Sequence, residues 1–212
     1  MSGVVNQVVG LATLDAMPRD AEATRERIFQ AATGEFAEHG LAGARIDAIA
    51  KRAQANKQLI YAYFGSKEEL FAAVVGRQLA RIDDEVALAP DRLPEYAGEI
   101  FDFHGEHPEL ARLLVSEALS YGAGPVPDQQ GREALKARKV KAVRAGQEHG
   151  SIDPSLDARD LLQFAIALAI WPTATPQVAR QIAGEDPDDP DVRARYRASL
   201  VEAVRRMIRP PS

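Results

Sequence analysis

The stretch from residue 45 to residue 70, RIDAIAKRAQANKQLIYAYFGSKEEL, constrains the fold of this chain most strongly. Apolar residues recur at helical spacing from Ile46 to Ala53, which predicts a short helix with a small, closely packing face. Gln54 to Asn56 interrupt the pattern, and Asn56 can cap a following helix by accepting from a backbone N–H. Two short helices joined by such a turn are typical of a helix-turn-helix, a motif that reads DNA.

The second predicted helix has an apolar inner side and a narrow outer side. Residues placed about 100° apart put Ile60 and Phe64 on the core side. The outer side fits a major groove, where base edges offer acceptors to Lys, amide pairs to Gln and a thymine methyl to Leu or Ala. The candidate base-reading residues are Lys57, Gln58, Leu59 and Ala62.

Residues beside and after this helix are candidates for phosphate contacts. Tyr61 and Tyr63 fall on its two flanks, where their hydroxyls can reach the walls of a groove. Ser66 and Glu69 then form an S-x-x-E capping box that starts another helix. The free amides of that helix and the Lys67 ammonium predict a phosphate site. Taken singly, these tyrosines would more often be core aromatics and Lys67 a solvated residue, but their spacing favours DNA binding.

The stretch resembles the DNA-binding domain of TetR-type transcriptional regulators. Those carry a pattern with I-A-x-x-A in the first helix, L-Y-x-[YH]-F in the second and S-K-E after it. The chain matches at Ile49-Ala50, Ala53, Ile60-Tyr61, Tyr63-Phe64 and Ser66-Lys67-Glu68. The resemblance implies base contacts near Lys57, Gln58 and Leu59, and phosphate contacts by Tyr61, Tyr63 and Lys67.

Three positions depart from the TetR pattern. Gln54 stands where the turn usually has Gly, and a positive φ at this position would strain the backbone. Arg45 replaces the Thr that usually caps the first helix, and it adds a cation beside the expected path of the DNA backbone. Ala62 stands where many members have His or another large residue.

The distribution of charge is compatible with a DNA-binding role despite the net charge of −5. Residues 45–67 contain five basic residues and one acidic residue. Residues 71–212 contain 18 basic and 22 acidic residues. The acidic excess therefore lies outside the predicted DNA-binding segment, where it does not oppose counterion release at the basic patch.

Composition excludes some other classes of protein. With no cysteine in its 212 residues, the chain has neither a disulfide framework nor a thiolate zinc site. The longest apolar run, residues 161–171, is far shorter than the roughly 18 residues that suggest a membrane span. No basic region precedes the apolar residues of the N-terminus, so a secretory signal is not expected. We expect a cytoplasmic protein without membrane contacts, whose translation starts at Met1 or Met17.

Helix patterns continue to the end of the chain, and no β alternation is evident. The prediction is an all-α fold with an N-terminal three-helix domain and a C-terminal helical domain for ligand binding and dimerisation. The domains expected are a mobile extension (1–18), the helix-turn-helix domain (19–65) and the C-terminal domain (66–212), with a fourth helix at about 66–87 linking the last two. Further helices are expected at about 20–39, 94–107, 108–121, 131–148, 161–171 and 191–209, with Asp157 and Asp191 as caps of the last two.

The last two long helices suggest a homodimer. The segment 161–171 is apolar nearly all round, which a helix tolerates only when several of its sides are buried. TetR-type regulators pair through two such helices per chain, so the resemblance implies an interface at about 157–171 and 191–209. A dimer would present two recognition helices to a palindromic DNA site. A core helix within one chain is the alternative.

Candidate ligand-binding residues in the C-terminal domain are aromatic residues with one histidine. They could line an apolar pocket offering few polar groups, although core packing is the ordinary role of each. These candidates are Phe101, His104, Tyr121, Phe164 and Trp171. His104 and His107 share a spacing that could hold a metal, but no third ligand is evident, so neither a metal nor a cofactor is expected. The basic helix 131–148 is interpreted as a solvated face.

The function expected is that of a transcriptional repressor released from double-stranded DNA by a small-molecule effector. The alternative is a helical enzyme or ligand-binding protein without DNA-binding activity, using His104, His107 and Glu109 as an acid/base cluster. No motif of a known catalytic class supports that alternative.

Overall fold

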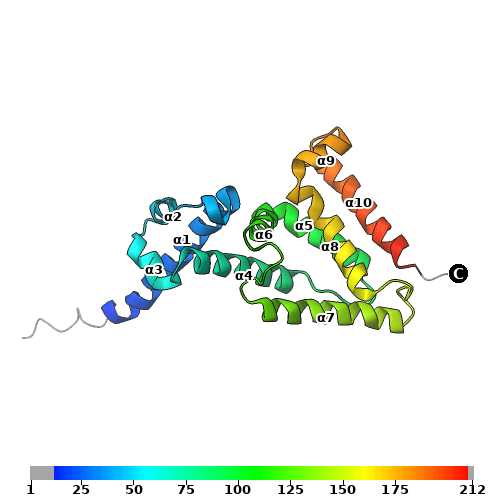
Figure 1. Ribbon diagram of the computed structural model, residues 1–212, viewed down its shortest axis with the longest axis horizontal. Helices are drawn as coiled ribbons and strands as arrows, with labels where there is room; N and C mark the ends of the chain where they lie inside the picture. Colours follow the sequence, from blue (N-terminus) through cyan, green and yellow to red (C-terminus); the bar gives the residue numbers. More distant parts are fainter. Residues whose placement is uncertain (1–11, 210–212) are drawn as a thin grey trace, which may run out of the picture. The chain divides into compact units, whose positions relative to one another are not determined.

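The computed structural model describes the backbone of residues 12–209 and the side chains of residues 21–209, and this part of the chain is helical without strands (Figure 1). The described residues divide into two compact units, the first ending at Val74 and the second beginning at Val75. The predicted all-α class is confirmed.

The first unit packs three helices and the start of a fourth around one apolar core. Its helices are α1 (Ala12–Gly43), α2 (Ile46–Ala53), α3 (Lys57–Phe64) and the first part of α4 (Lys67–Glu85). Phe36 of α1 meets Phe71 of α4 edge to face, with ring centroids 5.1 Å apart. Leu70, Phe71 and Val74 are fully buried. Because these residues complete the core of the first unit, the division between the units lies inside α4 rather than at the predicted position 65/66.

Helix α1 starts earlier than the expected position near Asp20, since the backbone is helical from Ala12. Ala and Leu residues, which favour helices, continue upstream of Asp20. The rest of the predicted extension, residues 1–11, lies outside the described residues. At Gly40, the residue after the expected end of this helix at position 39, the helix is broken by φ 67° and ψ 176°, a conformation that only glycine adopts readily.

The second unit surrounds α5 with other helices. It contains the end of α4 together with α5 (Leu93–Glu106), α6 (Pro108–Tyr121), α7 (Gln129–Glu148), α8 (Ala158–Ala174), α9 (Pro176–Ala183) and α10 (Pro190–Met207). Helix α5 packs against α6, α8 and α10. Nine of its 14 residues are buried. This helix is therefore the centre of the unit.

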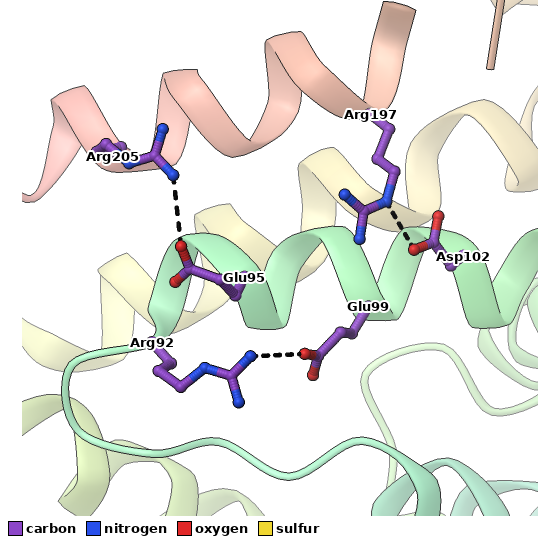
Figure 2. A network of polar contacts seen from close by, with 6 residues as sticks. All are labelled: Arg92, Glu95, Glu99, Asp102, Arg197 and Arg205. Atoms are coloured by element: carbon purple, nitrogen blue, oxygen red, sulfur yellow. Dashed lines mark hydrogen bonds and ion pairs between the residues drawn. The ribbon is translucent and has the colours of Figure 1, made fainter. Parts of the chain in front are cut away.

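Two glycines of α5 let arginines of α10 lie close against its backbone. A Cβ atom at Gly98 would lie 3.2 Å from the guanidinium carbon of Arg197, and one at Gly105 would overlap the guanidinium of Arg193. Figure 2 shows the ion pairs that join the two helices, Arg197 Nε to Asp102 Oδ2 at 2.6 Å and Arg205 Nη2 to Glu95 Oε1 at 3.4 Å. Such half-exposed pairs add at most about 1 kcal/mol each, but they define how the helices align.

The same view contains a third ion pair, which lies within α5 and its N-terminal turn. Arg92 Nη2 lies 3.1 Å from Glu99 Oε1 (Figure 2). Glu95 and Asp102 thus face α10, whereas Glu99 pairs with the residue that precedes α5. Of these three acidic side chains of α5, two therefore form ion pairs with α10 and one forms an ion pair at the start of α5 itself.

Two details of the C-terminal helices differ from the sequence expectation. The N-cap of α10 is Asp189, whose carboxylate accepts from the backbone N–H groups of Asp191 and Val192, so Asp191 is not the cap. Pro190 takes the first helical position, where the missing N–H is no loss. Helix α9 was not expected, and Pro176 starts it in the same way. The predicted cap Asp157 does accept from the backbone N–H of Arg159 at 2.7 Å.

Within residues 12–209, no single helix is long and apolar enough to cross a membrane. Only α8 and α9 taken together reach that length and composition, and they are bent by 90° at their junction.

Candidate nucleic-acid interface and ligand cavity

The turn between α2 and α3 has the geometry of a helix-turn-helix. Gln54 adopts the left-handed conformation, with φ 52° and ψ 44°, so the positive φ considered at this position is present. A side chain other than glycine costs on the order of 1 kcal/mol there. Asn56 Oδ1 accepts from the backbone N–H of Leu59 at 2.8 Å, which confirms the predicted cap of α3.

Packing against α1 and α2 fixes the orientation of α3. Ile60 is buried in the core of the first unit, as predicted. The Phe64 ring lies 6.5 Å from that of Phe29, and the guanidinium of Arg25 lies over Phe64. Arg27 of α1 donates to the carbonyl of Ala53 at the end of α2, at 3.2 Å. Because its inner face is held in this way, α3 presents a defined outer face.

Most of the predicted DNA-contacting side chains are accessible to solvent. Arg45, Lys57, Gln58, Tyr61 and Ala62 are exposed. Leu59, Tyr63 and Lys67 are half-buried.

Lys57 is engaged in an ion pair within the first unit. Its Nζ lies 2.5 Å from Asp47 Oδ1 of α2. Both side chains are at least half exposed, so the pair contributes at most about 1 kcal/mol and can be broken at little cost. Asp47 is therefore the acidic group that competes with any anion for this lysine.

The predicted capping box at the start of α4 is present and reciprocal. The backbone N–H of Glu69 donates to Ser66 Oγ at 3.1 Å, and the backbone N–H of Ser66 donates to Glu69 Oε2 at 2.8 Å. Lys67 Nζ donates to the carbonyls of Ala42 and Ala44, at 3.5 and 3.4 Å. This lysine thus holds the segment between α1 and α2, in addition to any contact that it makes with DNA.

Glu35 supports the start of α2 and was missed by the sequence reasoning. Arg45, the N-cap residue, offers no side-chain cap, but its backbone N–H donates to Glu35 Oε1 at 3.1 Å. Glu35 is buried, and a carboxylate at a helix N-terminus is favourable. The signal in the sequence is an acidic residue between Ala32 and Phe36, two apolar residues of α1 that are fully buried.

The second unit contains a cavity of about 290 Å³ between α4, α5, α6, α7 and α8. Its walls are mainly aliphatic, with Leu79, Ile82, Ile100, Leu114, Ile166 and Ile170 among them. The volume lies at the lower end of the range of about 300–1,000 Å³ that is usual for ligand pockets.

Two partly buried ion pairs lie at the polar part of this cavity. Lys139 of α7 pairs with Asp83 of α4, and its Nζ lies 5.4 Å from the ring centroid of Tyr96. Arg132 of α7 donates through both terminal nitrogens to Glu117 of α6, at 2.7 and 3.0 Å. Both acidic groups thus have a cationic partner within the protein.

Three buried polar atoms of the cavity lining have no hydrogen-bond partner. They are Tyr96 Oη, His104 Nδ1 and Arg132 Nε. Burial, reinforced by the charge of His107, lowers the pKa of His104 to about 4, so its ring is neutral near pH 7. Burial also raises the pKa of Tyr96, and the neighbouring Lys139 only partly opposes this.

The structure does not bring the five predicted ligand-binding residues together. His104 lines the cavity, whereas Phe101 and Trp171 line a second, smaller cavity of about 130 Å³ next to α9 and α10. Phe164 is exposed on α8, and Tyr121 lies at the end of α6, outside both linings.

The polar residues of the main cavity were missed for two reasons. Arg132, Lys136 and Lys139 follow a spacing of four and three along α7, which was interpreted as a solvated face. Asp83, the partner of Lys139, lies 56 residues before it in the sequence, and nothing local connects the two.

The alternative acid/base cluster is only partly assembled. His107 Nδ1 lies 3.6 Å from Glu109 Oε1 and 3.4 Å from Arg81 Nη1, whereas His104 is buried in the lining of the cavity. No group of three His, Asp or Glu residues with the arrangement of a metal site occurs among the described residues.

Two family profiles match the chain. Residues 28–74 match "Bacterial regulatory proteins, tetR family", and residues 92–206 match "Tetracyclin repressor-like, C-terminal domain". The first match covers the helix-turn-helix, and the second covers most of the second unit.

Curated relatives and a solved structure extend this similarity over nearly the whole chain. The chain is 45% identical to the HTH-type transcriptional repressor SCO4008 of Streptomyces coelicolor, over 90% of this chain and 97% of the relative. It is 33% identical to the HTH-type transcriptional repressor Rv3405c of Mycobacterium tuberculosis, over 92% and 94% of the two chains. The chain also resembles the crystal structure of the Streptomyces coelicolor protein SCO4942, with 38% sequence identity and a TM-score of 0.76, over 89% of this chain and 99% of the other.

The buried position of His104 predicts a specific loss of stability in mild acid. Its pKa in the folded chain is about 4, below the value of about 6.5 for a free histidine, so the stability from this group is complete above pH 6.5 and is lost as the pH falls toward 4. Between pH 7 and pH 5 this histidine should lower the free energy of unfolding by about 2 kcal/mol. Urea denaturation should show that His104→Gln removes this part of the pH dependence. Identical pH profiles for the two proteins would contradict the assignment.

Proposed function

Because the chain belongs to the TetR family of bacterial transcriptional regulators, and so is a DNA-binding regulator, we propose that it is a homodimeric repressor released from a palindromic operator by a small-molecule effector. The observation that carries the proposal is the accessible outer face of α3, which a capped helix-turn-helix holds against the core of the first unit. Repression agrees with the names of the two relatives. Its place of action would be the cytoplasm.

Within this proposal, the residues of the first unit divide into readers and clamps. Lys57, Gln58 and Leu59 read bases, with Ala62 beside them on the same helix face. Tyr61, Tyr63, Lys67 and Arg45 contact phosphates. The exposure of Gln58 and Tyr61 supports this division, and neither side chain has a hydrogen bond within the described part of the protein. Lys67 would combine a phosphate contact with its bonds to the carbonyls of Ala42 and Ala44.

The proposed dimer forms through α8 and α10. Phe164, Leu168 and Trp171 recur at helical spacing on α8 and are 45%, 37% and 51% exposed. Large apolar side chains gathered on one helix face commonly mark a contact with another protein. Helix α10 packs against both α8 and α5, so it is a suitable second helix of the interface (Figure 1). Dimers are general in this family, and what we propose for this chain is that α8 and α10 form the interface.

The effector would bind the cavity of the second unit. Of the five candidate ligand-binding residues, His104 is the one that lines this cavity. Phe101 and Trp171 would belong to the smaller cavity, and Tyr121 and Phe164 have no proposed contact with a ligand in the main one. Helix α4 supplies residues to the cavity and also to the core of the first unit. A ligand that prefers one position of α4 can therefore alter DNA binding, provided that its affinity differs between the two states.

The enzyme alternative is not favoured. Members of the family are transcriptional regulators and are not normally enzymes. His104 is buried in the lining of the cavity, and only His107 and Glu109 of the three lie within ion-pair distance of each other, which gives the cluster little support as an acid/base site.

Selection of bound DNA from a random pool by the full chain tests the proposal. We expect the enriched sequences to share an inverted repeat, with half-sites separated by about one helical turn or a multiple of it. Sequencing of the bound fraction and a gel-shift assay would measure this. A single, asymmetric site would contradict the dimeric mode of reading, and no enrichment at all would contradict DNA recognition.

Two substitutions on α3 test the division into readers and clamps. Gln58→Ala should cost about 1–3 kcal/mol at particular base pairs of the selected site and little on unrelated DNA. Tyr61→Phe removes only a hydroxyl and should weaken binding to both DNAs by a similar factor, because phosphates carry no sequence information. Fluorescence anisotropy with both DNAs measures the two effects. Equal, sequence-independent losses from both variants would refute the division. Tyr61 is a cleaner choice than Lys67, which also supports the fold.

Asp47→Asn should strengthen DNA binding. The substitution frees Lys57 from its ion pair and removes a negative charge beside α3. We expect the affinity to rise by roughly three- to tenfold at low salt, and the gain to shrink as the salt concentration rises. Asp188→Asn, which removes one exposed charge from the loop before α10, is the matched control for net charge. Similar gains in both variants would mean that Lys57 has no particular role.

A further inference from the structure

The lining of the main cavity contains an unusual concentration of unpaired polar atoms. Among the described residues, four buried side-chain polar atoms have no hydrogen-bond partner, and three of them line this cavity. Buried polar atoms are nearly always paired in folded proteins, so an unpaired cluster around a space calls for an occupant. The cavity is therefore built for more than an apolar guest.

The charges of the lining are unequal. Asp83 is paired with Lys139, and Arg132 is paired with Glu117. Lys136 is the remaining charged side chain of the lining, and no carboxylate among the described residues pairs with it. It lies one turn from Arg132 on α7 and also lines a shallower hollow beside the loop before α7. An ammonium group without a counterion thus lies where the cavity meets solvent.

We infer that the effector is a small amphipathic anion, such as an aryl or alkyl carboxylic acid, whose carboxylate pairs with Lys136 and whose apolar body fills the aliphatic part of the cavity. This inference rests on the proposed function, since it names the chemical class of the effector of that cavity.

The hydrogen-bonding capacity of the lining matches an anion. Lys136 and Arg132 Nε can only donate, and Tyr96 Oη and His104 Nδ1 can donate or accept, depending on rotor and tautomer. A carboxylate offers acceptors alone and can satisfy such donors. A cationic ligand would instead have to displace Lys139 from Asp83 or Arg132 from Glu117, leaving a largely desolvated cation without its partner.

The surroundings of Lys136 agree with this assignment. Although much of its side chain is exposed, desolvation by the surrounding protein lowers the pKa of Lys136, and the charges of Lys139 and Arg132 lower it further while Asp83 partly opposes them. Positive charge therefore accumulates around this end of the cavity, and an anion would relieve it.

Three probes with one apolar body and different charges test the inference. They are 4-phenylbutyrate, its neutral amide and 4-phenylbutylamine, each titrated calorimetrically into the full chain without DNA. We expect the carboxylate to bind at least about tenfold more tightly than the amide, because an ion-paired hydrogen bond replaces a neutral one, and the amine to bind most weakly. Equal binding of carboxylate and amide, tighter binding of the amine, or no binding of any probe at millimolar concentration would overturn the inference.

Two variants of α7 locate the carboxylate. Lys136→Met should lower the affinity for 4-phenylbutyrate by about tenfold and leave that for the amide nearly unchanged. Lys141→Met removes an exposed lysine of the same helix that does not line the cavity, and it should leave both affinities as they are. Equal effects of the two variants would place the anion elsewhere and overturn the role of Lys136.

The operator affinity of the chain, measured with each probe added, keeps this inference separate from the proposed function. Selective carboxylate binding without any release of DNA would leave the ligand class standing and contradict effector control. Release of DNA by the amine but not by the carboxylate would support effector control and overturn the ligand class.

Discussion

Helix α5 is the element on which the second unit depends, because its two faces serve different neighbours. One face turns Tyr96, Ile100 and His104 into the cavity. The other carries Glu95 and Asp102, which pair with Arg205 and Arg197 of α10 (Figure 2). Glycines at 98 and 105 let the arginines approach the backbone, so a side chain at either position would push α10 away. A change in the cavity that moved α5 would therefore reach α10 directly, since interfaces packed in this way do not deform smoothly.

The unpaired atoms of the cavity have an energetic meaning. Buried polar atoms are nearly always hydrogen-bonded in folded proteins, and three such atoms of the cavity lining have no partner within the described part of the chain. The surrounding core is apolar, with Leu93, Phe101, Leu110 and Leu161 buried around α5. A ligand that offered acceptors to these atoms would gain affinity from hydrogen bonds that the protein does not make by itself. The polar atoms of the lining can in this way give selectivity for a ligand that carries acceptors.

The first unit could be predicted from sequence much better than the cavity, because its signals are local. The cap Asn56, the Ser66–Glu69 box and the buried Ile60 all lie within one short stretch, and each is present as expected. The cavity instead depends on pairs such as Asp83 with Lys139, which meet only when distant helices pack. Helical periodicity locates an apolar face but does not reveal that one edge of a basic helix is buried. The interpretation of α7 as a solvated face holds for Arg138, Lys141 and Arg144, which are exposed, and fails where α7 closes the cavity.

Some side chains that a motif assigns to DNA also hold the reading helix in place, and this changes how substitutions are interpreted. Lys67 donates to the carbonyls of Ala42 and Ala44. The next residue, Arg45, donates its backbone N–H to Glu35. Loss of Lys67 would therefore release the entry to α2 as well as one cation, and a general loss of DNA binding would follow from either cause. Gln58 and Tyr61 have no such second contact among the described residues, so substitutions there would test the proposed recognition without disturbing the first unit. To separate a loss of DNA recognition from a loss of folding, substitutions should therefore be made at residues that have no contact within the protein, rather than at those that fit the motif best.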